Sequence, residues 1–364
     1  MKFSCQKELL LDAVLTTSKA AAVKTTIPAL EGLLLELKGN KLSITGYNLD
    51  IGIKTTIDVQ GEVDGTTVMS AKLSGDVIRK MPSGMLTIEI ENNVAVISCG
   101  ATEFSLACIS ADDYPVMPQV NPDKSFTISQ KLLKNMIIQT KFAAAVSDTK
   151  PVLMGCLFEV KDNILYVVAI DGVRIAMRKE PIQFEDIKFI VPLKTLDEIV
   201  HILSDEDDKN TVISIDRNQI SFGVDNYIMI SRLIDGDFPP YMGHITKEMA
   251  SFAEVNTREM VTMLDRTMLI VNEKNKVPLR CEFGSDSISI RCETALGKIN
   301  DKIAVKYTGE AAVVGFNSKY MLDAFKACDT DCVKMYVGSK VDPIIIKPMQ
   351  GDEFIYLVLP MRLK

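Results

Sequence analysis

The sequence predicts an α+β protein made of three tandem domains, each with two helices packed on β-sheets. The first observation is a stretch that occurs three times: the segment beginning at Gly155 matches the segments 123 residues before it and 123 residues after it. The second is that helical and strand patterns surround each copy in the same order. Such a long period exceeds that of solenoid repeats, so each copy is expected to be a whole domain. We place the domains at 1–120, 121–246 and 247–364.

The recurring stretch is typical of a β-hairpin. Glu36, Glu159 and Glu282 hold the same position in the three copies, and apolar residues alternate around them. The two alternating runs of each copy are joined by a turn, such as Lys161-Asp162-Asn163 in the second. We therefore expect one hairpin in the same register in every domain, which aligns Leu42 with Leu165 and Ile288, and Ile44 with Val167 and Ile290.

Helical spacing of apolar residues precedes and follows each hairpin. The first helix of each domain is predicted at 6–22, 130–145 and 257–271, and the second at 71–81, 193–203 and 318–328. Phe3, Phe126 and Phe252 mark a strand before each first helix, and the longer spacing to Phe252 indicates a small insertion. Further strand pairs follow the second helices, such as 86–91 with 94–99 and 211–216 with 219–224.

Composition limits the chemistry that this chain can perform. No apolar run approaches the roughly 20 residues that span a membrane, and the N-terminal residues lack a signal region, so we expect a cytoplasmic protein. The eight cysteines are scattered, mostly inside apolar patterns, which favours buried free thiols over zinc ligands. The two histidines leave little basis for nucleophilic or metal chemistry. We predict no catalytic residue, no metal and no cofactor.

Basic residues recur on the predicted helices, although the chain has a net charge of −7. That net charge argues against a protein that coats nucleic acid by bulk electrostatics. Domains that present such helices side by side would nevertheless form a basic lining. The alternative for any single residue is an ordinary solvated helix face. The recurring basic residues are Lys7, Lys19, Lys24, Lys72, Arg79, Lys80, Lys131, Lys134, Lys141, Lys194, Arg258, Arg266, Lys319 and Lys326.

Several short motifs, in a fixed order along the chain, point to a family. They are Met1-Lys-Phe3, Ile27-Pro-Ala-Leu30, Ile170-Asp-Gly-Val-Arg174, Leu233-Ile-Asp-Gly-Asp-Phe-Pro239, Val271-Asn-Glu-Lys274, Gly315-Phe-Asn317 and Tyr356-Leu-Val-Leu-Pro-Met-Arg-Leu363. With these motifs, the three repeats and this length, the chain resembles the bacterial DNA polymerase III beta subunit, the replicative sliding clamp. The resemblance covers essentially the whole chain. It implies a head-to-tail homodimer that closes into a ring of six domains, encircles duplex DNA and tethers the polymerase.

The resemblance also implies which residues meet DNA and the second subunit. A sliding contact must be independent of sequence, so a sparse set of Lys and Arg facing phosphates suits it. The family's DNA-facing positions fall on Lys24, Lys72, Lys150 and Lys194, to which the helix pattern adds Arg79 and Lys80. The family's ring-closing contacts fall on Phe104 and Leu106 in the first domain, against Leu269 and Ile270 in the third. An exposed apolar edge of this kind needs a partner to cover it.

The family's partner site is an apolar groove at the junction of the second and third domains. It accepts a short linear motif shared by the polymerase III alpha subunit, the clamp loader, other polymerases and repair proteins, and flexible apolar side chains suit several peptides. Val173, Ile170 and Gly243 stand where the best-known members have His, Thr and Arg, and Lys364 follows the usual terminal Leu, so the exact peptide preference should differ. The matching positions are Leu153, Ile170, Gly172, Val173, Arg174, Ile175, Pro239, Asn317, Tyr320, Val341, Pro343, Val358, Leu359, Pro360, Met361 and Arg362.

Two other classes of function compete with the clamp. An enzyme would use Asp171 and Arg174 as a catalytic pair, with Asp50 or Glu36 as acids. Neither other copy repeats Asp-Gly-x-Arg, however, and no His, Cys or Gly-rich phosphate loop stands nearby. The second alternative is a scaffold that binds peptides without encircling DNA, against which the recurrence of Lys and Arg on both helices argues.

Overall fold

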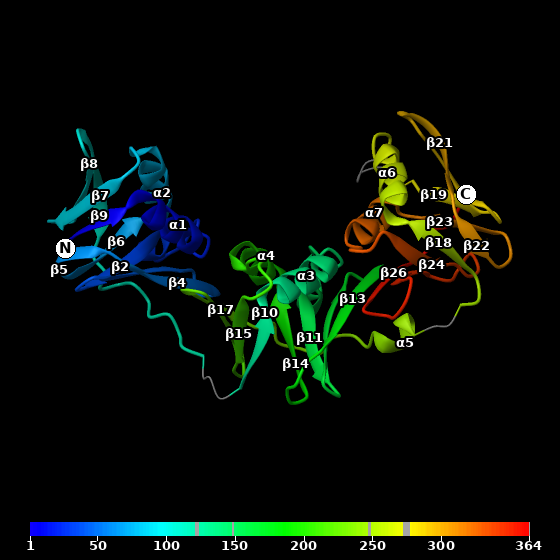
Figure 1. The fold of residues 1–364 in the computed structure, drawn as a ribbon, viewed down its shortest axis with the longest axis horizontal. Coiled ribbons are helices and arrows are strands. Elements are labelled where there is room, and N and C mark those ends of the chain that lie inside the picture. Colours follow the sequence, from blue (N-terminus) through cyan, green and yellow to red (C-terminus); the bar gives the residue numbers. More distant parts are fainter. Residues whose placement is uncertain (121–123, 148, 247–248, 272–276, 364) are drawn as a thin grey trace. The chain divides into compact units, whose positions relative to one another are not determined.

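The computed structural model describes residues 1–120, 124–147, 149–246, 249–271 and 277–363 (Figure 1). Lys364 and most of the Val271-Asn-Glu-Lys274 motif therefore lie outside the described residues. The chain forms two compact units, Met1–Leu132 with Asp197–Leu233, and Leu133–Leu196 with Ile234–Lys364. The boundary passes through the predicted second domain because its strands are shared between two sheets, one with first-domain strands and one with third-domain strands.

The same order of elements occurs three times. Each domain has a strand and a long helix, then a hairpin with two further strands, a second helix, and three closing strands. In the first domain these are β1 (Lys2–Gln6), α1 (Lys7–Ser18), β2 (Gly32–Lys38), β3 (Lys41–Tyr47), β4 (Ile51–Asp58), β6 (Gly65–Ser70), α2 (Ala71–Lys80), β7 (Met85–Glu91), β8 (Val94–Cys99) and β9 (Thr102–Ile109). The 3-10 helix η1 (Pro28–Glu31) and the short strand β5 (Gln60–Val63) are additions to this plan.

The other two domains follow the same plan. The second contains β10 (Ser125–Ser129), α3 (Gln130–Lys141), η2 (Pro151–Leu153), β11 (Gly155–Lys161), β12 (Ile164–Ile170), β13 (Arg174–Pro181), β14 (Ile187–Pro192), α4 (Leu193–Ile202), β15 (Asn210–Ile215), β16 (Gln219–Val224) and β17 (Tyr227–Arg232). The third contains α5 (Met242–Ile245), β18 (Phe252–Asn256), α6 (Thr257–Thr267), β19 (Leu279–Phe283), β20 (Ser287–Thr294), β21 (Gly297–Ala304), β22 (Lys306–Thr308), β23 (Ala312–Phe316), α7 (Ser318–Lys326), β24 (Cys332–Tyr336), β25 (Ile344–Pro348) and β26 (Phe354–Val358).

Apart from the short strands β5 and β22, which pair with β1 and β18, the strands of each domain form two antiparallel groups of four. One group is β6-β2-β3-β4 in the first domain, β14-β11-β12-β13 in the second and β23-β19-β20-β21 in the third. The other is β1-β7-β8-β9, β10-β15-β16-β17 and β18-β24-β25-β26. Successive domains join edge to edge, since β4 pairs with β17 and β13 pairs with β26. The corresponding strand of the third domain, β21, has no strand on its outer edge within the described residues.

The predicted hairpin register is confirmed in all three domains. Glu36 faces Ser43, Glu159 faces Tyr166 and Glu282 faces Ser289, which is the same position on each hairpin. In the second hairpin both turn residues, Asp162 and Asn163, have positive φ values of 53° and 59°. Asn and Asp tolerate this left-handed conformation, which a tight two-residue hairpin turn requires at both positions.

The helix predictions are also confirmed, although the first helices end earlier than predicted. Thr17, Thr140 and Thr267 are buried at the end of these helices, and each hydroxyl donates to the carbonyl four residues before it. Beyond Thr17 the chain continues with tighter backbone bonds, such as that from the Ala20 N–H to the Thr17 carbonyl at 3.1 Å. Such bonds are common where a helix ends, and apolar spacing alone does not reveal them.

The predicted equivalence of Phe252 with Phe3 and Phe126 is wrong by one residue. Gln6, Ser129 and Asn256 each stand directly before the first helix, so Ala253 is the counterpart of Phe3 and Phe126. Ala253 is fully buried like Phe3, whereas Phe252 is half-buried and packs its ring on Tyr336. Neighbouring strand residues point to opposite faces, so a shift of one residue exchanges core for surface.

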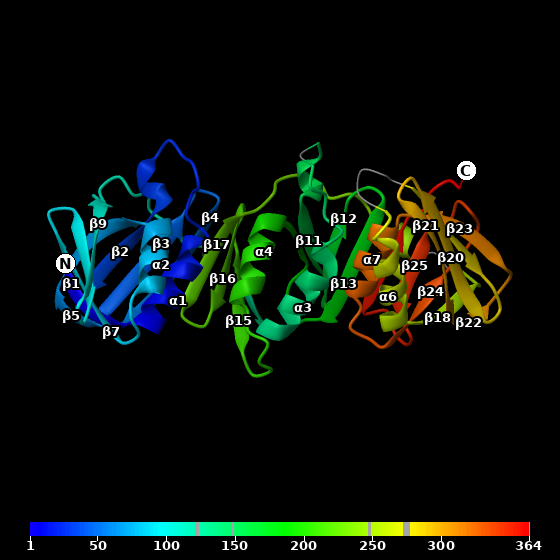
Figure 2. The same cartoon turned by 90° about the horizontal axis from the view of Figure 1, so that it is seen from above.

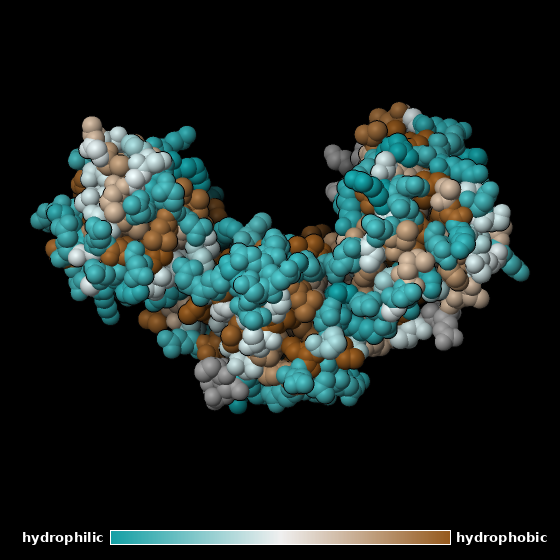
Figure 3. Space-filling model, in the orientation of Figure 1, coloured by the Kyte–Doolittle hydropathy of each residue, from teal (hydrophilic) through white to brown (hydrophobic). Residues whose placement is uncertain are grey.

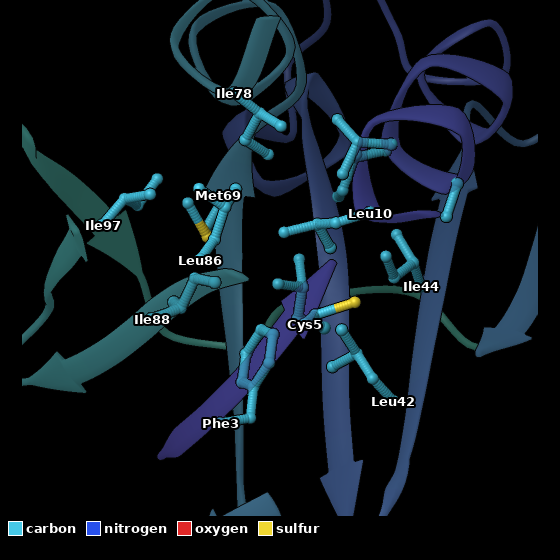
Figure 4. Packing of buried hydrophobic residues seen from close by; sticks show 14 of the residues in the cluster. Phe3, Cys5, Leu10, Leu42, Ile44, Met69, Ile78, Leu86, Ile88 and Ile97 are labelled. Carbon is cyan, nitrogen blue, oxygen red and sulfur yellow. The ribbon is translucent and has the colours of Figure 1, made fainter. Parts of the chain in front are cut away.

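The first domain has a core between its helices and its sheets. In the first domain, Phe3 and Cys5 of β1 pack with Leu10 of α1 and with Ile88 of β7 (Figure 4). Helices α1 and α2 lie beside each other on one face of these strands, and α6 lies beside α7 in the third domain (Figure 2). The opposite faces of the helices are left to solvent. Among the described residues, no helix is long and apolar enough to cross a membrane.

Candidate functional site

Several of the predicted groove residues lie where the C-terminal segment meets the start of β13. Arg174 faces Val358 across the strand pair, and the Leu359 N–H donates to the Val173 carbonyl at 2.9 Å. The chain then crosses to β23, where the Met361 N–H donates to the Gly315 carbonyl at 2.7 Å. The beginning of β13, the end of β23 and the C-terminal segment are therefore held together by backbone bonds.

Asp171 and Gly172 form the turn that opens β13. The Oδ1 atom of Asp171 accepts from the Val173 N–H at 3.0 Å and from the Arg174 N–H at 3.1 Å. Gly172 has a φ of 94°, a conformation that glycine adopts without strain. This turn presents Val173 outward, with 41 % of its surface exposed.

Arg174 links β13 to α7. Its Nε donates to Asp171 Oδ2 at 2.8 Å and its Nη1 donates to Asp323 Oδ2 at 2.9 Å. The guanidinium also lies over the Tyr320 ring, 4.4 Å from the ring centre. Only 12 % of the Arg174 side chain is exposed. Arg174 thus bonds to the carboxylates of both Asp171 and Asp323. The pair of Asp171 and Arg174, which was considered as a catalytic alternative, has the geometry of a structural cross-link.

Asn317 fixes the first turn of α7 and with it Tyr320. The Asn317 side chain accepts from the backbone N–H groups of Lys319 and Tyr320, at 2.9 and 3.3 Å, which satisfies two of the unpaired donors at the helix N-terminus. Lys319 also pairs with Asp323, the residue that holds Arg174. Polar contacts therefore hold Tyr320 and Arg174 in place beside the C-terminal segment.

The structure divides the predicted groove residues into a buried floor and an exposed rim. The floor is apolar and belongs to the core of the second unit: Leu153, Ile170, Ile175 and Val358 are each less than a tenth exposed. The exposed rim consists of Gly172, Val173, Val341, Leu359 and Arg362. The remaining residues, Arg174, Pro239, Asn317, Tyr320, Pro343, Pro360 and Met361, are half-buried between them. A peptide would therefore meet the rim and the half-buried residues first.

The first unit contains the counterpart of this turn with a charged rim. Asn48 Oδ1 accepts from the N–H groups of Asp50 and Ile51, as Asp171 does in the second unit. The Arg232 N–H donates to the Asp50 carbonyl at 2.9 Å, which is the counterpart of the bond between Leu359 and Val173. Asp50 and Arg232 thus stand where the second unit has Val173 and Leu359. At these two positions the second unit is apolar and the first is charged, although the first also exposes Leu49 in this turn.

The predicted DNA-facing residues are all exposed. Lys24 and Lys150 lie in the loops that follow α1 and α3, whereas Lys72 and Lys194 are the second residues of α2 and α4. Arg79 and Lys80 end α2, and Arg79 pairs with Asp76 on the surface at 3.2 Å. Such an exposed ion pair is weak, so it leaves Arg79 able to meet another anion.

The predicted ring-closing residues lie beside two open strand edges. The strand β9, which carries Phe104 and Leu106, pairs with β8 along its length but with β6 only through Cys108 and Ile109. Phe104 is 39 % exposed. Among the described residues, no strand covers the outer edge of β9 at 102–107, and the third domain leaves the edge of β21 open in the same way.

Leu269 and Ile270 lie next to the start of β21. Leu269 is 81 % exposed. Ile270 lies against Gly297, since a Cβ atom added to this glycine would be 3.7 Å from the Ile270 side chain. Figure 3 shows hydrophobic surface at this end of the third domain, where Leu296 in the turn between β20 and β21 is also exposed. Leu296 and Ile299 are not among the predicted ring-closing residues, although the apolar alternation of the third hairpin and of the strand after it includes both.

The cysteines differ from the prediction at one position. Five are buried and two are half-buried, but Cys332 is exposed because β24 begins there at the surface. Burial raises the pKa of the Cys5 thiol to about 11, which keeps it protonated and unreactive near neutral pH. Among the residues that the structure describes, no group of three His, Cys, Asp or Glu side chains could hold a metal ion.

Comparisons with known proteins agree on one family. Models of the N-terminal, central and C-terminal domains of the DNA polymerase III beta subunit match residues 1–118, 127–240 and 244–362. The chain is 31 % identical to the beta sliding clamp of Halalkalibacterium halodurans and 32 % identical to that of Bacillus subtilis, and all of this chain and of each relative is covered.

Solved structures give the same result. The crystal structure of a putative DNA polymerase III beta subunit from Eubacterium rectale matches with a TM-score of 0.94 and 33 % identity over the whole of both chains. The sliding clamp from Bacillus subtilis matches with a TM-score of 0.94 and 30 % identity, again over both whole chains. With three domain models matched in order and relatives aligned from end to end, the chain belongs to the DNA polymerase III beta subunit family.

Proposed function

We propose that this protein is a DNA sliding clamp, a ring-shaped homodimer that encircles duplex DNA. It would tether the replicative polymerase and other partners for processive synthesis, without a catalytic site of its own, in the bacterial cytoplasm. The observation that carries the proposal is the repeated edge-to-edge joining of domains. Two such joints exist, β4 with β17 and β13 with β26. Within the described residues, the two edges that would make a third joint, β21 and residues 102–107 of β9, have no further strand beside them. We place the three domains at 1–120, 121–246 and 247–364.

A second copy of the chain is the partner that fits both open edges. The edge of β21 would pair with β9 of the second copy, and β9 with its β21, so the head-to-tail dimer closes on itself without leaving a free edge. The relatives named as sliding clamps favour a closed dimer over an open filament. Covering Phe104, Leu106, Leu269 and Ile270 would add apolar burial to the backbone pairing.

The internal repeat gives the register of this contact. Thr55 pairs with Tyr227 in the first joint and Arg178 pairs with Phe354 in the second. Asp301 is the third-domain counterpart of Thr55 and Arg178, because each faces the same hairpin position, Ile44, Val167 or Ile290. Thr102 is the counterpart of Tyr227, since each begins the last strand of its group.

This equivalence pairs Asp301 with Thr102, Ile299 with Phe104 and Gly297 with Leu106. The pairing brings the apolar ring of Phe104 onto Ile299 and places Leu106 beside Ile270, which already lies against Gly297. Residues 269, 270 and 299 then form one apolar surface against residues 104 and 106 of the second copy. We propose these as the ring-closing contacts.

We propose that Lys24, Lys72, Arg79, Lys80, Lys150 and Lys194 face the encircled duplex. All six are exposed. Contacts of this kind attract phosphates without fixing a sequence, which lets the ring slide. The partner groove described above would take the short linear motif of the polymerase III alpha subunit, the clamp loader, other polymerases and repair proteins. Its apolar rim supports this role.

The test of the ring is retention on DNA of two shapes. The protein is loaded with a clamp loader and ATP onto nicked circular DNA, the circle is cut once, and the bound fraction is followed. We expect the protein to stay on the circle and to leave the linear product, because a topological link ends where the DNA ends. Equal retention on both shapes would mean ordinary affinity binding, and a peptide-binding scaffold would replace the clamp as the function.

Reversing two charges tests the basic lining separately. In K24E/K194E two exposed cations become anions, so we expect slower loading and shorter products in a processivity assay, by about tenfold at low salt and less at high salt. The control K161E/K306E changes two lysines on strands β11 and β22 instead. Unchanged loading and product length in K24E/K194E would show that these lysines do not meet the duplex.

A further inference from the structure

The strands β19, β20 and β21 of the third domain carry a basic hollow on the face that points away from the helices. Cys281, Ile290 and Asp301 face one another on the inner side, where Asp301 bonds to Arg266 of α6. Successive side chains of a strand point to opposite faces, so the neighbours of these three residues point outward. The hollow has a volume of about 480 Å³, and its outward side chains are Glu282, Ser289, Arg291, Asn300 and Lys302.

Positive charge prevails in this hollow. Within the described residues, Arg291 and Lys302 form no ion pair, and the Arg291 Nε donates to the neutral side chain of Asn300 at 2.9 Å. The one outward acid of the lining, Glu282, already accepts from the Arg280 Nε at 2.8 Å. The hollow therefore carries positive charge that the described part of the chain does not balance.

The register proposed for the ring-closing joint brings a carboxylate to this hollow. It pairs Ile299 with Phe104, and therefore Asn300 with Glu103 of the second copy. Phe104 faces the fully buried Ile97 across the strand pair, so Glu103, one residue earlier, points outward as Asn300 does. Glu103 is exposed, and among the described residues of its own copy its side chain has no ion-pair or hydrogen-bond partner.

Cations surround the position that Glu103 would take. Diagonal neighbours across an antiparallel strand pair lie about 7–8 Å apart, within reach of long side chains. The diagonal neighbours of Glu103 would be Lys298 and Lys302, and Arg291 lies on the next strand of the same face. Lys298 is paired with Glu293 at 3.7 Å, and both side chains are exposed. Such a pair is weak, so Lys298 is able to meet Glu103 as well.

The two joints inside the chain differ from this one at the same place. Met177 faces Ile355 in the second joint, where both are almost fully buried in an apolar cluster, and Lys54 faces Ile228 in the first. Neither joint sets an acid against cations. Charged side chains are hydrated when a contact separates, whereas apolar ones are not, so a charged contact suits the one joint that must open to admit a DNA circle.

We propose that this hollow receives Glu103 of the second copy, with Lys298, Lys302 and Arg291 as its ion-pair partners. The inference rests on the proposed ring and assigns the charged, outward half of the joint, behind the apolar contact of Phe104 with Ile299. Complementary charges favour the correct edge over other partners and speed its encounter, and salt weakens them. Closure of the ring is therefore salt-dependent through this face.

Reversing and then exchanging the charges tests the contact in the full-length protein. E103K places a lysine among three cations at both joints, so the dissociation constant of the dimer in sedimentation should rise about tenfold or more at about 50 mM salt and much less at about 500 mM. K302E should weaken the dimer as well. E103K/K302E restores opposite charges and should recover most of the loss, which a purely structural effect of either substitution would not do.

The control E62K/K306E makes the same two changes of charge on β5 and β22, outside the joint, and should dimerise like the unchanged protein. Normal dimerisation of E103K, or no recovery in E103K/K302E, would overturn the proposal. A third result would also overturn it: E103K dimerises normally, and a peptide of glutamates binds the unchanged protein but not R291A/K302A. The hollow would then serve an acidic segment of another partner.

The fate of the unchanged protein on DNA separates this contact from the clamp itself. If the unchanged protein leaves circular and linear DNA equally, the ring and this contact are both wrong. If it stays on the circle and E103K dimerises normally, only the contact is wrong and the clamp function stands.

Discussion

Replacing Leu359 by Asp is expected to weaken binding of a partner peptide by about 100-fold or more, on the order of 3 kcal/mol. Leu359 belongs to the exposed rim of the groove, so its substitution leaves the core of the second unit untouched. A peptide that covers the rim would have to bury the new carboxylate against apolar groups, which costs free energy. Fluorescence anisotropy with a labelled peptide carrying the family's short linear motif measures the change.

The first unit provides a matched control for this substitution. Arg232 occupies the position of Leu359 at the corresponding turn, where its N–H makes the same backbone bond. R232D therefore introduces the same carboxylate in the same local geometry but outside the groove, and peptide affinity should not change. Equal losses in both variants would mean that the effect is not specific to the groove, and normal affinity in L359D would contradict the assignment of the rim.

Deleting residues 359–364 should abolish binding of the polymerase and the clamp loader while the dimer persists. The deletion also removes the bond from Met361 to Gly315 and the packing of Leu363 against Gly315, so some loss of stability is expected with it. The single substitution avoids this second effect, because the backbone of the C-terminal segment keeps its bonds. If L359D and the deletion both lose binding, the loss comes from the missing rim and not from unfolding of the C-terminal segment.

Patterns that depend on near neighbours in the sequence were predictable. The hairpin register follows from alternation over a few residues, and the three glutamates fixed it in every domain. The helices follow from apolar spacing in the same way. The error at Phe252 also comes from a local pattern. Phe252 was aligned with Phe3 and Phe126 because all three are phenylalanines, whereas the distance to the start of the helix gives the correct alignment.

Contacts between distant parts of the chain were not predictable from these patterns. Arg174 was expected at the groove, but its bond to Asp323, which is far away in the sequence, shows only in the folded chain. Apolar residues of the floor and of the rim look alike in the sequence, since burial depends on which strand covers them. Likewise, Arg258 and Lys319 are both basic helix residues, and only ion pairing distinguishes them.

A covalently closed dimer is the expected product when F104C/I299C is oxidised. Facing residues of antiparallel strands have Cα atoms about 4.5–5.5 Å apart, a range in which disulfides form. The two substitutions would give one bond at each joint, and nearly all of the protein should run as a dimer on a denaturing gel without reductant. The unchanged protein, which retains exposed Cys332, shows how much dimer the native thiols form on their own.

The register itself is tested by E103C/I299C. Residue 103 is one position along the same strand, so its side chain points to the other face of the sheet and should not reach residue 299. Dimer from this variant, with none from F104C/I299C, would mean that the strands pair one residue out of the proposed register. No dimer from either variant would mean that β21 and β9 do not meet. If F104C/I299C is loaded onto nicked circular DNA before oxidation, the closed bonds should prevent the protomers from separating, and reduction should restore their release, because the ring holds DNA only while both joints stay shut.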